Sequence, residues 1–180
     1  RSYVLAKLQD WQQAADLLPL HFDELSFYPP YVALPLSLTL AEVALRSGDL
    51  ERSQELFDIA RRNSNSMTKE DKAAFQYLRG EAARQEGKFD ETIELWKPLA
   101  LSRDDLFRVK AGLALTRIDV EEKKMPLPKA VDRLERLRYA WRGDDLEAQV
   151  NYWLGRIYFD AADYVKGLNT MRDAATFATG

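Results

Sequence analysis

The sequence contains no cysteine and only one histidine, His21. The missing thiols exclude disulfides, thiolate zinc sites, iron–sulfur clusters and cysteine nucleophiles. A single histidine cannot build a multi-histidine metal site, and a Ser-His-Asp triad would depend on His21 alone. His21 follows residues 17–20, where a helix is expected to end, and this position favours a packed or capping side chain. We therefore expect no catalytic residue, no cofactor and no metal site.

Long apolar runs and an excess of positive charge are also missing. The longest uncharged stretch, residues 25–41, contains three prolines and is shorter than the ~20 apolar residues of a spanning helix, so we expect no membrane insertion. The 26 Lys and Arg against 29 Asp and Glu give a net charge of −3. Phosphate binding needs a net basic surface, so we expect no nucleic-acid partner. The first residues lack a signal-peptide pattern, and a start at Arg1 suggests a piece of a longer protein.

What the sequence has in abundance favours helix. Hydrophobic residues make up 46% of the chain, which is enough for a core. They recur every three or four positions, and no segment shows the sustained alternation of a strand. The sequence therefore predicts an all-α fold, with helices at residues 2–9, 11–19, 31–47, 49–62, 69–86, 89–101, 104–121, 127–141, 145–160 and 163–177.

Three short joints indicate that these helices form antiparallel pairs. They are residues 47–50, 86–89 and 161–164. Gly48 and Gly87 are 39 residues apart in the first two joints, and Ala162 stands in the same place in the third. Glycine at a helix end accepts the left-handed backbone that other residues resist. A helix pair that recurs at such a period is typical of an α-solenoid.

The repeated units resemble tetratricopeptide repeats. The last unit carries the resemblance in Leu154-Gly155, Tyr158, Ala162-Asp163-Tyr164 and Ala174. Two earlier units fit the same frame, one through Gly80, Ala83, Gly87, Phe89 and Trp96, the other through Ala41, Ala44, Gly48, Leu50, Phe57 and Ala60. Ser53, Thr92 and Gly167 depart from it, because the family prefers Ala there.

The resemblance implies a right-handed α-solenoid of about five helix pairs in one domain over residues 1–180. The units would be 1–30 (partial), 34–67, 73–104, 105–143 (degenerate, with an extended turn) and 148–180. Small residues such as Ala41, Gly80 and Gly155 would let helices approach closely. The aromatic residues would fill the space between pairs, and they are Phe57, Phe89, Trp96, Tyr158 and Tyr164.

In this family the first helix of each pair lines a concave groove. The frame then places eleven candidate binding residues on the groove wall: Tyr3, Lys7, Glu42, Arg46, Tyr77, Glu81, Arg84, Arg117, Tyr152, Arg156 and Phe159. It also places Leu45, Val109 and Leu113 there. Tyr and Arg are enriched in binding hot spots. Members that clamp a terminal carboxylate need Asn where this chain has Glu42 and Glu81, so we expect no such clamp.

The function predicted from the resemblance is a protein–protein interaction scaffold that binds a peptide or a partner helix in the groove. One alternative is a structural spacer within a longer solenoid, with self-association through the ends of the array. Another is RNA binding by helical repeats. A basic stripe at Lys129, Arg133 and Arg136 is interpreted as a solvated outer face, partly paired with acidic neighbours. Likeness to long bacterial repeat proteins and the missing cysteines suggest a bacterial envelope location, with the cytoplasm left open.

Overall fold

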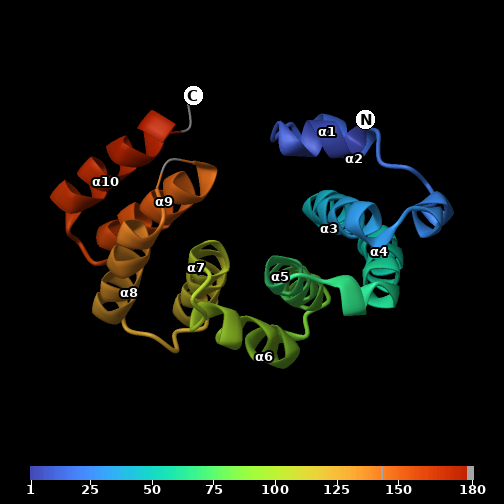
Figure 1. The fold of residues 1–180 in the computed structure, drawn as a ribbon. Helices are drawn as coiled ribbons and strands as arrows, with labels where there is room; N and C mark the ends of the chain where they lie inside the picture. The colour runs from blue at the N-terminus through green and yellow to red at the C-terminus, as the bar shows by residue number, and fades with distance from the viewer. Residues whose placement is uncertain (143, 178–180) are drawn as a thin grey trace. The chain divides into compact units, whose positions relative to one another are not determined.

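The computed structural model describes residues 1–142 and 144–177, and within them every regular element is a helix (Figure 1). This confirms the all-α prediction. The helices are α1 (Ser2–Lys7), α2 (Trp11–Asp16), α3 (Pro30–Arg46), α4 (Leu50–Arg62), α5 (Lys69–Gln85), α6 (Phe89–Ala100), α7 (Asp105–Glu121), α8 (Leu127–Ala140), α9 (Asp145–Asp160) and α10 (Tyr164–Phe177). Two short 3₁₀ helices, η1 (Asp23–Phe27) and η2 (Ser64–Ser66), were not predicted. No helix in this described part is both long and apolar enough to cross a bilayer.

The chain divides into two compact units. Unit 1 covers residues 1–95 and unit 2 covers residues 96–180, so the boundary falls inside α6. The five repeat units assigned from the sequence, and their union in one domain, stay predictions. Gly143 and residues 178–180, which belong to the last two of those units, lie outside the described residues.

Five joints in the chain share one left-handed residue. Positive φ angles occur at Gln9 (61°), Gly48 (76°), Gly87 (77°), Lys123 (55°) and Ala162 (61°), at intervals of 39, 39, 36 and 39 residues. At each joint, the N–H of the next residue donates to the carbonyl five positions back, as from Asp49 to Ala44 at 2.8 Å. This is the Schellman pattern that satisfies the last carbonyls of a helix. The glycine-based prediction is thus confirmed, and the three joints without glycine, at Gln9, Lys123 and Ala162, follow the same rule.

Acidic and hydroxyl side chains begin the helices. Asp49 accepts a hydrogen bond from the Arg52 N–H at 2.9 Å at the start of α4. This bond lowers the pKa of the Asp49 carboxyl. Thr68 and Asp71 form a reciprocal capping box at the start of α5. Each such cap satisfies backbone donors that the first turn of a helix leaves unpaired.

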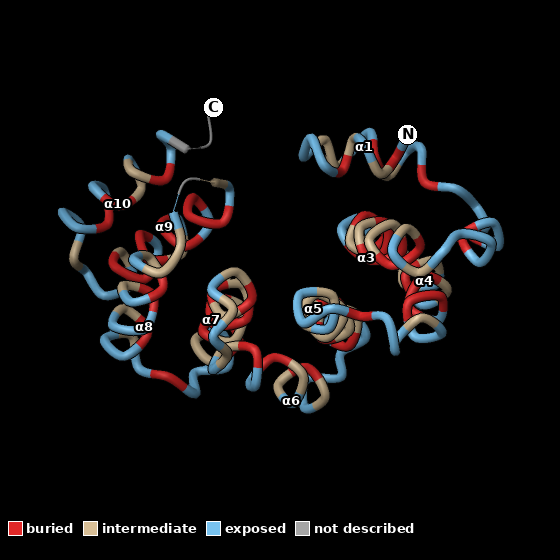
Figure 2. The backbone as a smooth tube through the Cα atoms, in the orientation of Figure 1, coloured by how far each residue is buried: buried red, intermediate tan, exposed pale blue. Residues whose placement is uncertain are grey.

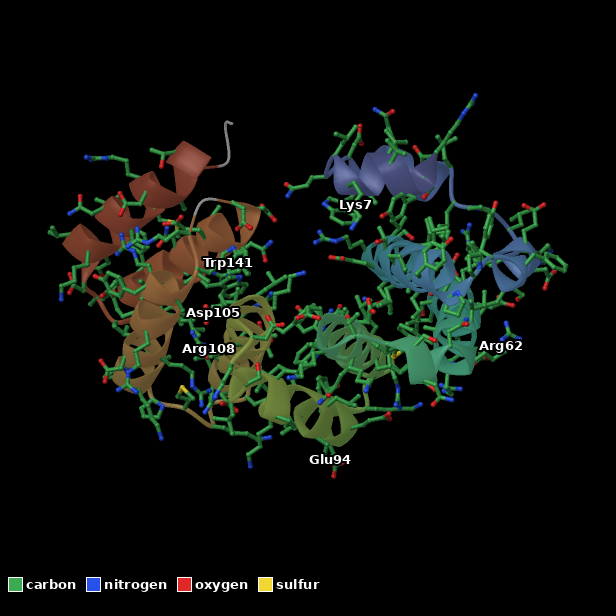
Figure 3. All side chains as sticks on the ribbon, viewed as in Figure 1. Lys7, Arg62, Glu94, Asp105, Arg108 and Trp141 are labelled. Carbon is green, nitrogen blue, oxygen red and sulfur yellow. The ribbon has the colours of Figure 1, made fainter. Side chains whose placement is uncertain are left out.

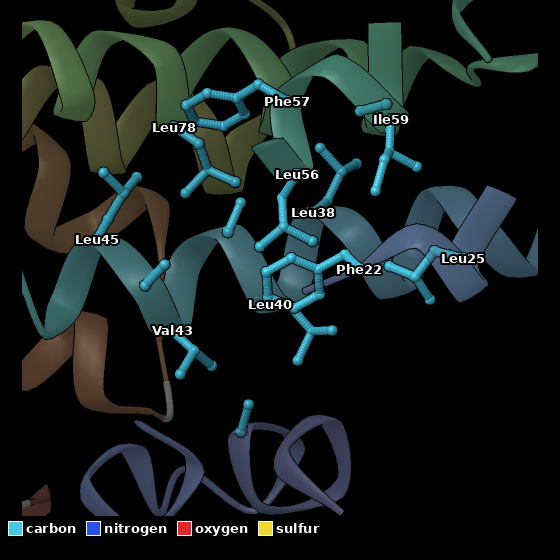
Figure 4. Close-up of a cluster of buried hydrophobic side chains, with 14 of the residues drawn as sticks. Phe22, Leu25, Leu38, Leu40, Val43, Leu45, Leu56, Phe57, Ile59 and Leu78 are labelled. Carbon is cyan, nitrogen blue, oxygen red and sulfur yellow. The ribbon is translucent and has the colours of Figure 1, made fainter. Parts of the chain in front are cut away.

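The core of unit 1 lies between α3, α4 and the segments that flank them. Nine residues of α3 and five of α4 are buried (Figure 2). Phe22, Leu40, Leu56 and Phe57 lie in the resulting apolar cluster (Figure 4). The cluster includes Leu45, which is 2% exposed. The prediction of Leu45 on a groove wall was therefore wrong, because its helix turns it toward the core.

The core of unit 2 joins α7, α8 and α9. Val109 and Leu113 belong to it at 0% and 4% exposure, which corrects their predicted place in the groove. The Tyr158 hydroxyl donates to Glu135 of α8 at 2.7 Å. Burial, followed by this hydrogen bond, raises the pKa of Tyr158 to about 12.

Helices α9 and α10 approach closely at two glycines. A Cβ added to Gly155 would lie 2.9 Å from Met171 Cγ and 3.3 Å from the Gly167 carbonyl oxygen. This confirms the predicted role of Gly155. Two of the predicted packing aromatics differ, because Phe89 and Tyr164 are 46% and 60% exposed. Each is the first residue of its helix.

Candidate functional site

Helices α7 and α9 hold the candidate site, a cluster of aromatic and arginine side chains. The first turn of each of these helices is capped by an aspartate side chain. Asp104 accepts a hydrogen bond from the Phe107 N–H at 3.1 Å at the start of α7. Asp144 accepts one from the Leu146 N–H at 3.0 Å, and the Trp141 indole donates to the same carboxylate at 2.8 Å. Figure 3 shows Trp141 and the paired Asp105 and Arg108 near these helix starts. The two helices are thus fixed at their beginnings as well as by the core.

The cluster consists of Arg117 on α7 and Tyr152, Trp153 and Arg156 on α9, and we name it the α7/α9 patch. The guanidinium carbon of Arg117 lies 4.1 Å from the centroid of the Trp153 ring, and that of Arg156 lies 4.8 Å from it. Both distances fall within the range of cation–π contacts. The Tyr152 ring meets Trp153 edge to face at 5.8 Å, and Tyr152 is 46% exposed.

The two arginines of the patch have no carboxylate partner among the described residues. Among the described residues, neither Arg117 nor Arg156 forms an ion pair, although Glu121 and Asp160 lie four positions further along the same helices. The Nε atom of Arg117 is buried and has no hydrogen-bond partner there. A guanidinium offers five N–H donors in a fixed plane. The patch therefore presents two stacked cations that the described residues leave without a carboxylate partner.

Unit 1 contains a similar stacked arginine that is neutralised. The Arg46 guanidinium carbon lies 3.9 Å from the Trp11 ring centroid. Here Glu42, on the same helix as Arg46, accepts hydrogen bonds from its Nε at 3.3 Å and Nη2 at 3.1 Å. The charge of this arginine is already compensated within α3.

The other predicted groove residues are arranged differently. Lys7 lies 5.4 Å from the Tyr3 ring centroid on α1. Arg84 pairs with Glu81 at 2.6 Å on α5, where Tyr77 is half-buried. The structure places Phe159 beside Tyr164 of α10, with ring centroids 6.2 Å apart. Of the eleven predicted residues, the α7/α9 patch brings together only Arg117, Tyr152 and Arg156.

The key ring of the patch, Trp153, was missed by the sequence reasoning. It does not belong to the repeat frame, so the resemblance gave it no role. Its spacing nevertheless contained a signal, because Trp153 precedes Arg156 by three residues and such side chains are neighbours on a helix. The contact with Arg117 depends on the packing of two helices and has no signal in the local sequence.

The basic stripe, His21 and the pocket beside α5 are weaker candidates for a binding site. Arg133 of the basic stripe pairs with Asp119 at 3.2 Å, as expected for a partly paired outer face, while Lys129 and Arg136 are exposed. His21 is exposed rather than packed, because it lies in the connection after α2. A pocket of about 120 Å³ between α4, α5 and α6 contains Arg79, Lys88 and Glu91. Its cations are paired with Glu91 and Glu86, and its volume is below the ~300 Å³ of a typical ligand site.

Within residues 1–142 and 144–177, no group of three or more acidic or histidine side chains is arranged to hold a metal ion. Comparisons with known protein families, with curated proteins and with solved structures found no match.

Proposed function

We propose that this chain is a protein-interaction module that resembles tetratricopeptide repeats, with antiparallel helix pairs in a right-handed solenoid. The five left-handed joints at intervals of 36 to 39 residues support this arrangement. Such a fold supplies rigid helices on which exposed side chains keep a fixed spacing. The proposed activity is binding rather than catalysis.

The observation that carries the proposal is the α7/α9 patch. It combines an exposed tyrosine, a half-buried tryptophan and two arginines without carboxylate partners in the described structure. Tyr, Trp and Arg are the residue types most enriched in binding hot spots. We propose that this patch binds a peptide or a helix of a partner protein.

Site-specific photocrosslinking tests this function. A photoreactive phenylalanine analogue replaces Tyr152, and in a matched control it replaces Tyr139 of α8, which is 70% exposed in the same unit. We expect a discrete crosslinked polypeptide from Tyr152 that Arg117→Gln diminishes, and no such product from Tyr139. Equal crosslinking from both positions, or none from Tyr152, would refute binding at the patch.

A second candidate function is a structural spacer in a longer solenoid. The exposed apolar residues Tyr164, Val165 and Leu168 of α10 favour it, at 60%, 72% and 59% exposure. A further helix pair of the same protein would cover them. Insensitivity of partner capture to every patch variant, together with loss of capture on Leu168→Glu, would favour the spacer.

A further inference from the structure

The partner chemistry of the α7/α9 patch follows from a comparison with the stacked arginine of unit 1. Arg46 lies over Trp11, and Glu42 neutralises its charge. The Glu42 carboxylate accepts hydrogen bonds from two guanidinium nitrogens of Arg46. Arg117 and Arg156 lie over Trp153 in the same manner, and the described residues supply no carboxylate to them. The described residues of unit 2 thus lack the carboxylate that unit 1 provides for its own stacked arginine.

We infer that the α7/α9 patch recognises an acidic segment of a partner protein, through two side-chain carboxylates that pair with Arg117 and Arg156. This inference rests on the proposed function and names the chemistry of the partner. Arginine is suited to this task, because its planar fork matches the geometry of a carboxylate. The carboxylates of the partner supply to these two arginines the negative charge that Glu42 supplies to Arg46.

The spacing of the two arginines favours two carboxylates on one peptide segment. Because their guanidinium carbons lie 4.1 and 4.8 Å from the same ring centroid, they are at most about 9 Å apart. Alternate side chains of an extended segment lie on one face at ~7 Å from each other. A chain terminus supplies only one carboxylate, so side chains meet the requirement better than a terminal group does.

The aromatic residues distinguish this partner from nucleic acid. Single-stranded nucleic acid binds by stacking successive bases on exposed aromatic faces along a basic groove. At the patch, the Trp153 ring is already in contact with two guanidinium groups and the Tyr152 ring. The chain as a whole carries a net charge of −3. Tyr152 remains available for an apolar neighbour of the two acidic residues.

A peptide titration tests this inference on the full chain. The probe is a fluorescent peptide of alternating glutamate and alanine, about twelve residues long, with both termini blocked. Its matched control has glutamine in place of glutamate. We expect the glutamate peptide to bind and the glutamine peptide to bind at least about tenfold more weakly. Arg117→Gln and Arg156→Gln should each weaken binding by about fivefold or more, since each removes a charge-assisted pair.

Two arginine variants serve as controls with the same change of charge. Arg136→Gln removes an exposed cation of the same unit on α8, and Arg46→Gln removes a stacked arginine that already has its carboxylate. Neither should change the affinity by more than about twofold, and circular dichroism melts verify that all variants are folded. No binding of the glutamate peptide to the wild-type chain, or equal losses in the control variants, overturns the inference.

Three further results bear on the source of the negative charge and on the proposed function. Binding of the glutamine peptide once its C-terminus is unblocked would assign the patch to a terminal carboxylate and overturn the inference. Tighter binding of a uridine oligonucleotide of the same length would overturn it in favour of RNA. Crosslinking from the Tyr152 position without binding of the glutamate peptide would leave the proposed function standing and reject the acidic partner alone.

Discussion

The five left-handed joints allow a reciprocal test, in which one glycine is removed and one is introduced. Gly87 has φ of +77° and no atom within 4 Å of a Cβ built on it, so Gly87→Ala meets no steric obstacle beyond its own backbone. Ala162 occupies the equivalent position with φ of 61°. The two substitutions therefore isolate the cost of a side chain in this conformation, with opposite signs.

The expected magnitude is the difference between two opposing effects. A non-glycine residue in the left-handed region costs ~1–2 kcal/mol. Replacing glycine by alanine also restricts the unfolded chain, which stabilises the folded state by ~0.4–1 kcal/mol. Since the first effect is larger, Gly87→Ala should lower the free energy of unfolding by about 1 kcal/mol, and Ala162→Gly should raise it by a similar amount.

Urea unfolding followed by far-UV circular dichroism measures both changes. In a chain of this length, 1 kcal/mol corresponds to ~2–4 °C in the melting temperature, so thermal melts provide a second readout. Gly48→Ala is the matched control, because a Cβ at Gly48 also meets nothing within 4 Å and φ is +76°. A neutral Gly87→Ala together with a destabilising Ala162→Gly would refute the assignment of these joints as equivalent.

Three further predictions concern packing and charge. Gly155→Val should destabilise the chain by ~1–3 kcal/mol, because its side chain would collide with Met171 and the α10 backbone. The control, Gly112→Ala, should change the melting temperature little, because its Cβ would meet the end of the Leu137 side chain. Asp49→Ala should lower the free energy of unfolding measured in urea by about 1 kcal/mol. Because the pKa of Asp49 is lowered in the folded state, the stability that this carboxylate contributes should be present above pH 3.8. It should disappear as the pH falls through the folded pKa. The pKa of Tyr158 is raised from 10.0 to about 12, so the stability linked to this group should be complete below pH 10.0 and be lost as the pH rises through about 12. Tyr158→Phe should remove that alkaline dependence, and an unchanged alkaline unfolding profile in the variant would contradict it.

Local features of the sequence were sufficient to predict the helices. Their periodicity and end signals are encoded within a few residues, as at Thr68 and Asp71, which form a capping box three residues apart. The joints at Gly48 and Gly87 were predictable because glycine is the residue that adopts a left-handed backbone at least cost. The equivalent joints at Gln9 and Lys123 were not, because there the helix geometry imposes that conformation on residues that do not favour it.

The candidate site depended on tertiary structure. The sequence alone placed Arg117, Tyr152 and Arg156 among eleven candidates, and its frame put Leu45, Val109 and Leu113 beside them. A shift of one residue along a helix decides whether a side chain faces the core or solvent. Only the packing of neighbouring helices shows which face of the helix is buried.

Charge compensation is only partly local. A glutamate stands four residues before Arg46, whereas a tyrosine stands four residues before Arg156. The structure separates them, because Glu42 lies within 3.1 Å of Arg46 and no described carboxylate pairs with Arg156. The sequence by itself determined the fold class and, to within one residue, the boundaries of α3 to α10, since these follow from local propensity and periodicity. Helices α1 and α2 end two and three residues before their predicted ends. The stacking of Arg117 on Trp153 was decided by tertiary structure alone, because it depends on a distance of a few ångströms between side chains of two different helices.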